Sequence, residues 1–140
     1  MGTPKNLVTI QYLKDGMELY QSGFNTKTAD NQTKAVWFSL NDLKEYIAYV
    51  ESEAKAKNIA VSGIRFHFIA ENNSPEAINL ALCPTFESAD SKGVTQQVSF
   101  DPSQSETGKP ANLSSLMDNT AKAATISCVM NNATRCPQIC

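Results

Sequence analysis

The chain has 140 residues, a formal net charge of −2 and 41% hydrophobic residues. This length fits one domain with a real core, and the apolar content argues against wholesale disorder. Lysine and arginine are scattered singly, so no basic stripe suits a nucleic-acid backbone, and no apolar run approaches the ~18 residues of a membrane-spanning helix.

The first predicted element is a helix. Residues 7–20 carry Ile10, Leu13, Met17 and Tyr20 at helical spacing. An Asp-Gly pair at 15–16 interrupts them, so a hairpin is the alternative. The polar segment 21–34 predicts a loop.

A second helix is predicted over residues 40–57. Ser39, followed three residues later by Asp42, is typical of a helix cap. Apolar side chains recur at steps of three and four residues: Leu40, Leu43, Ile47, Val50 and Ala54. We expect this stripe to pack on the core.

A hairpin should follow the second helix. Residues 61–70 alternate, with Ile64, Phe66, Phe68 and Ala70 on one side and Arg65 and His67 on the other. Residues 78–84 alternate too, and a polar turn at 71–75 separates the two runs. We expect the apolar face to rest on the 40–57 helix. A register that pairs residue 69 with 81 would place His67 opposite Cys83.

The last third of the chain predicts smaller elements. A third strand spans 94–100, 101–111 is a loop, and a short helix lies within 112–124. A final strand at 126–130 leads through a cysteine-containing segment, 128–140. The predicted fold is α+β, one domain over 1–140. It has a mainly antiparallel sheet of three to four strands packed against one long amphipathic helix, with one or two shorter helices.

Several short motifs resemble a family of small proteins frequent in Bacteroidetes. They are Trp-Phe-Ser-Leu at 37–40, Ser-Gly-Ile-Arg at 62–65, the strand leading to Cys83, and Cys-Pro-x-x-Cys at the C-terminus. His67 stands where the family pattern has an aromatic residue, and Gln138 where a second proline is common. The resemblance covers roughly half of the chain. It supports the predicted fold and implies no activity or cofactor.

The cysteines, Cys83, Cys128, Cys136 and Cys140, allow several interpretations. A disulfide could join Cys136 to Cys140, or Cys128 to either, in an oxidising compartment. Reduced thiols could instead be buried as small apolar side chains. A zinc site could combine all four cysteines with His67, although the spacing matches no common zinc motif. Redox catalysis is disfavoured, because the reactive Cys-x-x-Cys spacing is absent.

Arg65 and His67 are the candidate ligand-binding residues. The planar guanidinium of Arg65 could bind a carboxylate of a ligand or partner, or pair internally with Glu45, Glu51 or Glu71. His67, the only histidine, could be a general base, a metal ligand or a pH switch, or simply lie on the wetter face of its strand.

Three functions follow from these observations. The first is a non-enzymatic binding or assembly module for a protein, a small ligand or a second copy of the chain, and an exposed apolar patch would favour it. The second is a structural metal or thiol/disulfide site in 128–140, to which Cys83 and His67 could contribute; bound metal or thiol-dependent melting would favour it. The third is a small enzyme using His67, Arg65 and a cysteine, favoured by a deep pocket around the first two. The expected compartment is the cytoplasm, or a secreted or periplasmic location if the cysteines are bridged.

Overall fold

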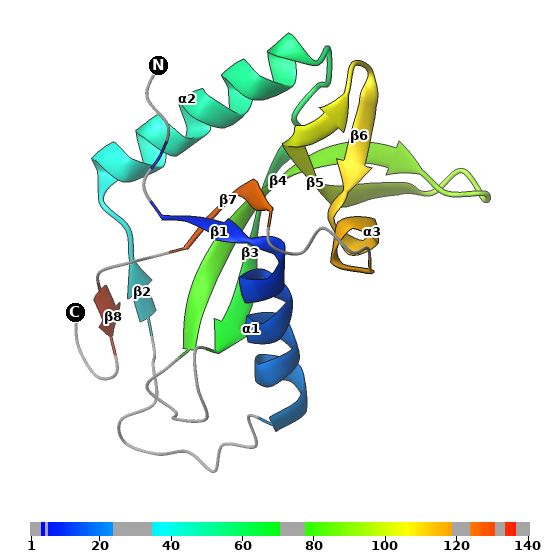
Figure 1. The fold of residues 1–140 in the computed structure, drawn as a ribbon. Helices are drawn as coiled ribbons and strands as arrows, with labels where there is room; N and C mark the ends of the chain where they lie inside the picture. The colour runs from blue at the N-terminus through cyan, green and yellow to red at the C-terminus, as the bar shows by residue number, and fades with distance from the viewer. Residues whose placement is uncertain are drawn as a thin grey trace.

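The computed structural model describes residues 4, 6–23, 35–70, 78–118, 124–130 and 134–136. Its elements, in chain order, are β1 (Leu7–Thr9), α1 (Ile10–Gly23), β2 (Ala35–Trp37), α2 (Leu40–Ala56), β3 (Gly63–Ala70), β4 (Ile78–Ala89), β5 (Thr95–Glu106), β6 (Lys109–Asn112), α3 (Leu113–Asp118), β7 (Thr125–Met130) and β8 (Thr134–Cys136) (Figure 1). None of the helices within these residues is long and apolar enough to cross a membrane.

The α+β class is confirmed, but the predicted sheet was too small. Six strands form one sheet in the order β1-β7-β4-β5-β6, with β3 paired to β4 off this path. β2 and β8 form a separate two-stranded sheet, and all recorded pairings are antiparallel. The prediction of three to four strands against one long helix is therefore wrong.

The predicted loop at 101–111 supplies part of the extra sheet. It forms the second half of β5 and most of β6. Pro102 and Pro110 and many polar residues concealed these strands, because proline is usually excluded from the interior of a sheet. The β5–β6 pairing shifts register between Asp101 and Glu106, and such irregular stretches tolerate proline.

Helices cover both faces of the sheet, and not only the face of the 40–57 helix. Leu82 of β4 packs with Tyr46 and Val50 of α2. Its neighbours Ala81 and Cys83 belong to a second cluster that includes side chains of α1 and α3. Because successive side chains of a strand point to opposite faces, the two clusters lie on opposite sides of β4.

The predicted helix at 40–57 is confirmed as α2. Ser39 Oγ accepts a hydrogen bond from the Asp42 amide at 2.9 Å. Its core-facing stripe differs from the prediction, since Leu40 and Ile47 are exposed and Tyr46 is buried. The Tyr46 hydroxyl lies 2.9 Å from Leu82 O and 2.6 Å from Ser127 O, so its one proton is shared between β4 and β7.

The helix predicted at 7–20 forms as α1, three residues later than expected, and the alternative hairpin at Asp15 and Gly16 does not form. Gly16 instead permits close packing. A Cβ atom at this position would lie 3.0 Å from Ile69 Cβ in β3. Glycine therefore lets the helix approach the sheet more closely than alanine could.

The β3–β4 hairpin forms, with a register two residues from the expected one. Ile69 pairs with Asn79, so His67 lies opposite Ala81 and Arg65 opposite Cys83. A shift of two residues keeps every side chain on its expected face, which is why alternation alone could not choose between the registers. The predicted turn at 71–75 and residues 24–34 of the predicted loop lie outside the described residues.

β5 and β7 share one edge of β4. Thr85 pairs with Gly63 of β3 on one side and with Ser99 of β5 on the other, so β5 lies opposite β3. β7 pairs with Ala81 and Leu82 of β4, and β3 pairs with the same two residues along the other edge of β4. β5 must therefore leave β4 beyond Ser99, and the sheet forks at this point.

Asp101 is fully buried at the fork. Its Oδ1 accepts hydrogen bonds from the backbone amides of Ser127 in β7, at 2.9 Å, and Ser103, at 3.0 Å. Ser103 Oγ lies 2.8 and 2.9 Å from the two carboxyl oxygens. One side chain thus satisfies polar groups of both diverging strands.

We expect Asp101→Ala to lower the free energy of unfolding by about 2–3 kcal/mol, because the buried Ser127 amide loses its acceptor. Urea unfolding measures this difference through the transition midpoint. Ser103→Ala is the matched control and should cost less than about 1 kcal/mol, since the carboxyl group keeps both amide donors. Equal stability of the two variants would contradict the role given to Asp101.

Candidate functional site

A disulfide joins Cys83 of β4 to Cys128 of β7, 45 residues apart in the chain. The pair follows directly from the register, because Leu82 pairs with Val129 in the preceding position. The Cα atoms are 4.5 Å apart, which is the spacing of a non-hydrogen-bonded antiparallel pair. Both side chains are fully buried, so this bond is a structural link between strands.

The pairing corrects two expectations from the sequence. Cys128 is bonded to Cys83 and not to Cys136 or Cys140. The five-ligand zinc set therefore loses two thiolates, since a disulfide sulfur is not a thiolate ligand. The side chain of Cys136 and the whole of Cys140 lie outside the described residues, so a bond between these two cysteines stays a prediction. The described residues contain no cluster of three or more potential metal ligands.

Trypsin digestion without reductant should yield residues 66–92 linked to residues 123–135, because these peptides contain Cys83 and Cys128. The cut after Arg135 separates Cys128 from Cys136 and Cys140, so mass spectrometry distinguishes the pairings directly. Reduction should lower the free energy of unfolding by about 4 kcal/mol, given the long loop that the bond closes. A link from 123–135 to 136–140 would contradict the structure.

The predicted site residues Arg65 and His67 belong to a polar cluster on the sheet face that also carries the disulfide. Arg65 donates to Gln97 O at 2.5 Å and to Ser99 Oγ at 3.4 Å, and His67 Nε2 lies 3.1 Å from the same hydroxyl. The cluster comprises Ser62, Arg65, His67, Thr85, Gln97 and Ser99.

Arg65 has no carboxylate partner among the described residues. The predicted pairing with Glu45 or Glu51 is not formed, because α2 packs on the face of Ile64, opposite Arg65. Glu71 lies outside the described residues. The exposed guanidinium is held by neutral acceptors, so its charge is available to an anionic group.

Two effects lower the pKa of His67, namely burial and a nearby positive charge. Burial lowers the pKa of its imidazole below the usual 6.5, and the nearby Arg65 guanidinium lowers it further. The ring is therefore neutral at neutral pH and could accept a proton. Its neighbour Ser99 is only 6% exposed, however, and no described carboxyl group orients the ring, so the pair lacks two features of a nucleophile and its base.

NMR titration of the single histidine should give a pKa below 6.5. The unfolded state binds this proton more readily than the folded state does. The contribution of His67 to the stability of the folded state is therefore complete above about pH 6.5, and it is lost as the pH falls through the lower folded pKa. His67→Gln should therefore lose less stability on acidification than the natural chain. Arg65→Gln should raise the His67 pKa only part of the way back to 6.5, since the ring stays buried. A pKa at or above 6.5 would contradict this account.

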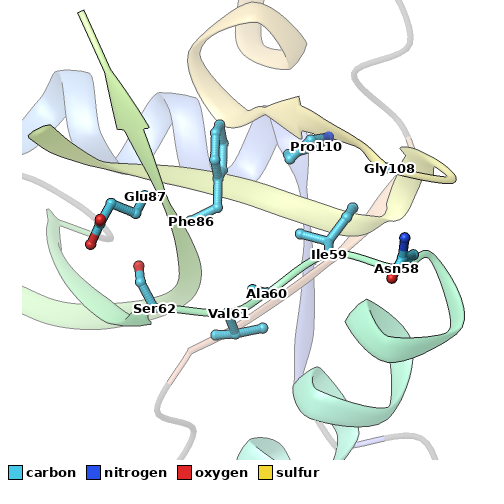
Figure 2. Close-up of a pocket in the computed structure, with 9 residues that line it drawn as sticks. All are labelled: Asn58, Ile59, Ala60, Val61, Ser62, Phe86, Glu87, Gly108 and Pro110. Carbon is cyan, nitrogen blue, oxygen red and sulfur yellow. The ribbon is translucent and has the colours of Figure 1, made fainter. Parts of the chain in front are cut away.

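A cleft of about 440 Å³ lies beside the polar cluster and shares Ser62 with it (Figure 2). One wall is the extended segment 59–62, which connects α2 to β3; the other is formed by Phe86 and Glu87 of β4. Gly108 of the β5–β6 turn and Pro110 of β6 close one end. The lining residues are Asn58, Ile59, Ala60, Val61, Ser62, Phe86, Glu87, Gly108 and Pro110. Arg65 and His67 do not line this cleft.

The end of α2 sets the position of this wall. Asn58 has a φ of 55°, and the Ile59 and Asn58 amides donate to Ala54 O and Lys55 O. These are the two hydrogen bonds of a Schellman motif, which ends the helix and redirects the chain. The Gly108 amide also donates to Lys57 O at 2.6 Å, which joins the β5–β6 turn to the end of the helix.

Sequence reasoning missed most of the cluster and all of the cleft. Gln97 and Ser99 alternate with Val98 and Phe100 in the predicted third strand, and this alternation was a usable sign of a polar face. No local pattern showed which strand would lie beside it. Comparison with protein-family models, curated proteins and solved structures found no match to this chain.

Proposed function

We propose that this protein is a non-enzymatic binding or assembly module with an apolar surface for a protein partner. The apolar surface is defined as Leu40 and Ile47 of α2 with Phe66 and Phe68 of β3. The observation that carries the proposal is their exposure, which is 68%, 43%, 50% and 56%, respectively. Large apolar side chains gathered on one face of a protein favour a partner-binding site.

One side-chain contact and the order of the strands support the grouping of these side chains. Tyr49 lies two residues, about 200° of helical rotation, from Ile47, and its hydroxyl is 3.4 Å from Ser127 Oγ in β7. β7 and β3 lie on opposite edges of β4. The helix flank with Ile47 and Leu40 therefore faces the β3 side, where Phe66 and Phe68 occupy the same face of the sheet as Ile64.

The two phenylalanines are held in place before a partner arrives. Phe66 is paired with Leu82 and Phe68 with Leu80, and the Tyr20 ring stacks on Phe68 with a centroid distance of 5.4 Å. Side chains on a paired strand lose little freedom on binding, so more of their burial contributes to affinity. Aromatic anchors of this kind dominate many protein interfaces.

The other features favour binding over catalysis. Ser99 is nearly inaccessible beside His67, and Cys83 is not a free thiol. We also propose that the chain belongs to the Bacteroidetes family that it resembles. The 37–40 motif of this resemblance contains the exposed Leu40. The disulfide supports an oxidising compartment, which would be secreted or periplasmic.

Phe66→Ser with Phe68→Ser should remove partner binding and leave the fold intact, because both side chains are about half exposed. The natural chain and this double variant would be used as baits in an extract of the source organism, and the retained proteins compared by quantitative mass spectrometry. We expect at least one protein to be depleted more than about tenfold with the variant, a change of ~1.4 kcal/mol.

Val94→Ser is the matched control, since Val94 is 56% exposed in the β4–β5 turn. It should retain the same proteins as the natural chain. Sedimentation velocity of the three proteins tests the second-copy case: self-association lost only with the double variant would make the partner another copy of this chain. If all three baits retain the same proteins and all three are monomeric, the apolar surface is not a docking site.

A further inference from the structure

The outer edge of β4 is open beyond the end of β3. The β3–β4 pairing stops at Gly63 and Thr85, and the Ser62 amide donates to Thr85 O at 2.8 Å. β4 continues to Ala89 and pairs there only with β5. Four residues of β4 therefore have a strand neighbour on one edge alone.

The hydrogen-bond pattern identifies the backbone groups on this open edge. The Asp90 amide donates to Val94 O, so even-numbered residues of β4 bond to β5. Thr85 O, by contrast, accepts from the β3 side. The amide and carbonyl groups of Glu87 and Ala89 consequently point outward, and no backbone partner of either is recorded among the described residues.

The cleft of Figure 2 lies along this open edge. Phe86 lines it from β4, and Ile59 and Val61 line it from the opposite wall. The space has the volume of a small-ligand or short-peptide site, and its walls would contact apolar side chains. An inserted strand would continue the ladder that β3 leaves at Gly63.

Glu87 adds a charge to this edge. Its carboxyl group accepts one hydrogen bond, from Gln97 Nε2 at 3.3 Å, and has no ion-pair partner among the described residues. The side chain alternates with Phe86 across the strand. A paired strand would therefore place one side chain beside Glu87 and its two neighbours on the face of Phe86.

We propose that this cleft binds an extended peptide segment in which a basic residue lies between two apolar residues. The backbone of the segment pairs with Glu87 and Ala89, its basic side chain meets the Glu87 carboxylate, and its apolar side chains contact Phe86, Ile59 and Val61. The site is separate from the apolar surface of Leu40, Ile47, Phe66 and Phe68, and the inference does not depend on the proposed function.

Hydrogen exchange of the free protein tests the open edge. The amides of Phe86 and Ser88, bonded to β5, should exchange slowly, whereas those of Glu87 and Ala89 should exchange fast. NMR resolves this alternation residue by residue. Protection of all four amides would mean that the edge is already paired, and would overturn the proposal before any peptide is added.

Peptide titration tests the recognition. The probes are acetyl-Ser-Val-Lys-Val-Ser-amide and its counterpart with Glu in place of Lys, each followed by amide chemical shifts at low-millimolar concentrations. We expect the Lys peptide to shift the amides of Glu87 and Ala89, to saturate, and to slow their exchange. It should bind the natural chain several-fold more tightly than the Glu peptide, as expected of an opposite-charge pair across strands.

Glu87→Lys should reverse this preference, and Glu51→Lys is its control, because Glu51 lies on the exposed face of α2 and changes the net charge equally. Both variants should keep the alternating exchange pattern, which shows that the hairpin is intact. No saturable shift at Glu87 or Ala89 with either peptide would overturn the proposal, as would an unchanged peptide preference in Glu87→Lys.

Discussion

The buried carboxyl group of Asp101 is the contact on which the arrangement of the sheet depends. β5 and β7 both use one edge of β4, and they can do so only if β5 turns away beyond Ser99. At this divergence an ordinary ladder would leave backbone amides unpaired, which is costly in a buried position. Asp101 accepts from the Ser127 amide across the gap, and the Tyr46 hydroxyl joins the carbonyl groups of β4 and β7 from the other face.

The fork also explains where the candidate surfaces lie. Because β5 follows β4 to the hairpin turn while β3 stops at Gly63, the end of β4 projects with one edge uncovered. The Schellman motif at Asn58 then places the α2–β3 connection at a distance from that edge, and the space between them is the cleft. Polar side chains from three strands gather beside it, since Thr85 and Ser99 are neighbours across the β4–β5 ladder.

The disulfide and the two helical layers divide the molecule into faces with different properties. Cys83 and Cys128 lock β4 to β7 under α1 and α3, whereas α2 covers the opposite face only in part. The buried Tyr46 and Val50 of α2 pack with Leu82 and Val129 of the inner strands, and Phe66 and Phe68 of β3 remain exposed. The face that α2 leaves open is apolar, and the face around Arg65 is polar, so the two sides of β3 suit different kinds of contact.

Local sequence determined the α+β class, the α2 helix with its Ser39 cap, and the shared face of Arg65 and His67, because each depends on neighbours within a few residues. The tertiary structure alone decided that this face meets Ser99, more than 30 residues away, and that Cys83 bonds to Cys128. Only the tertiary structure, too, buries Tyr46 while leaving Ile47 exposed, and only there do most residues of the proline-containing segment at 101–111 form strands. These outcomes depend on which strands become neighbours. Periodicity records the direction of a side chain relative to its own backbone and carries no information about the partner on the other side.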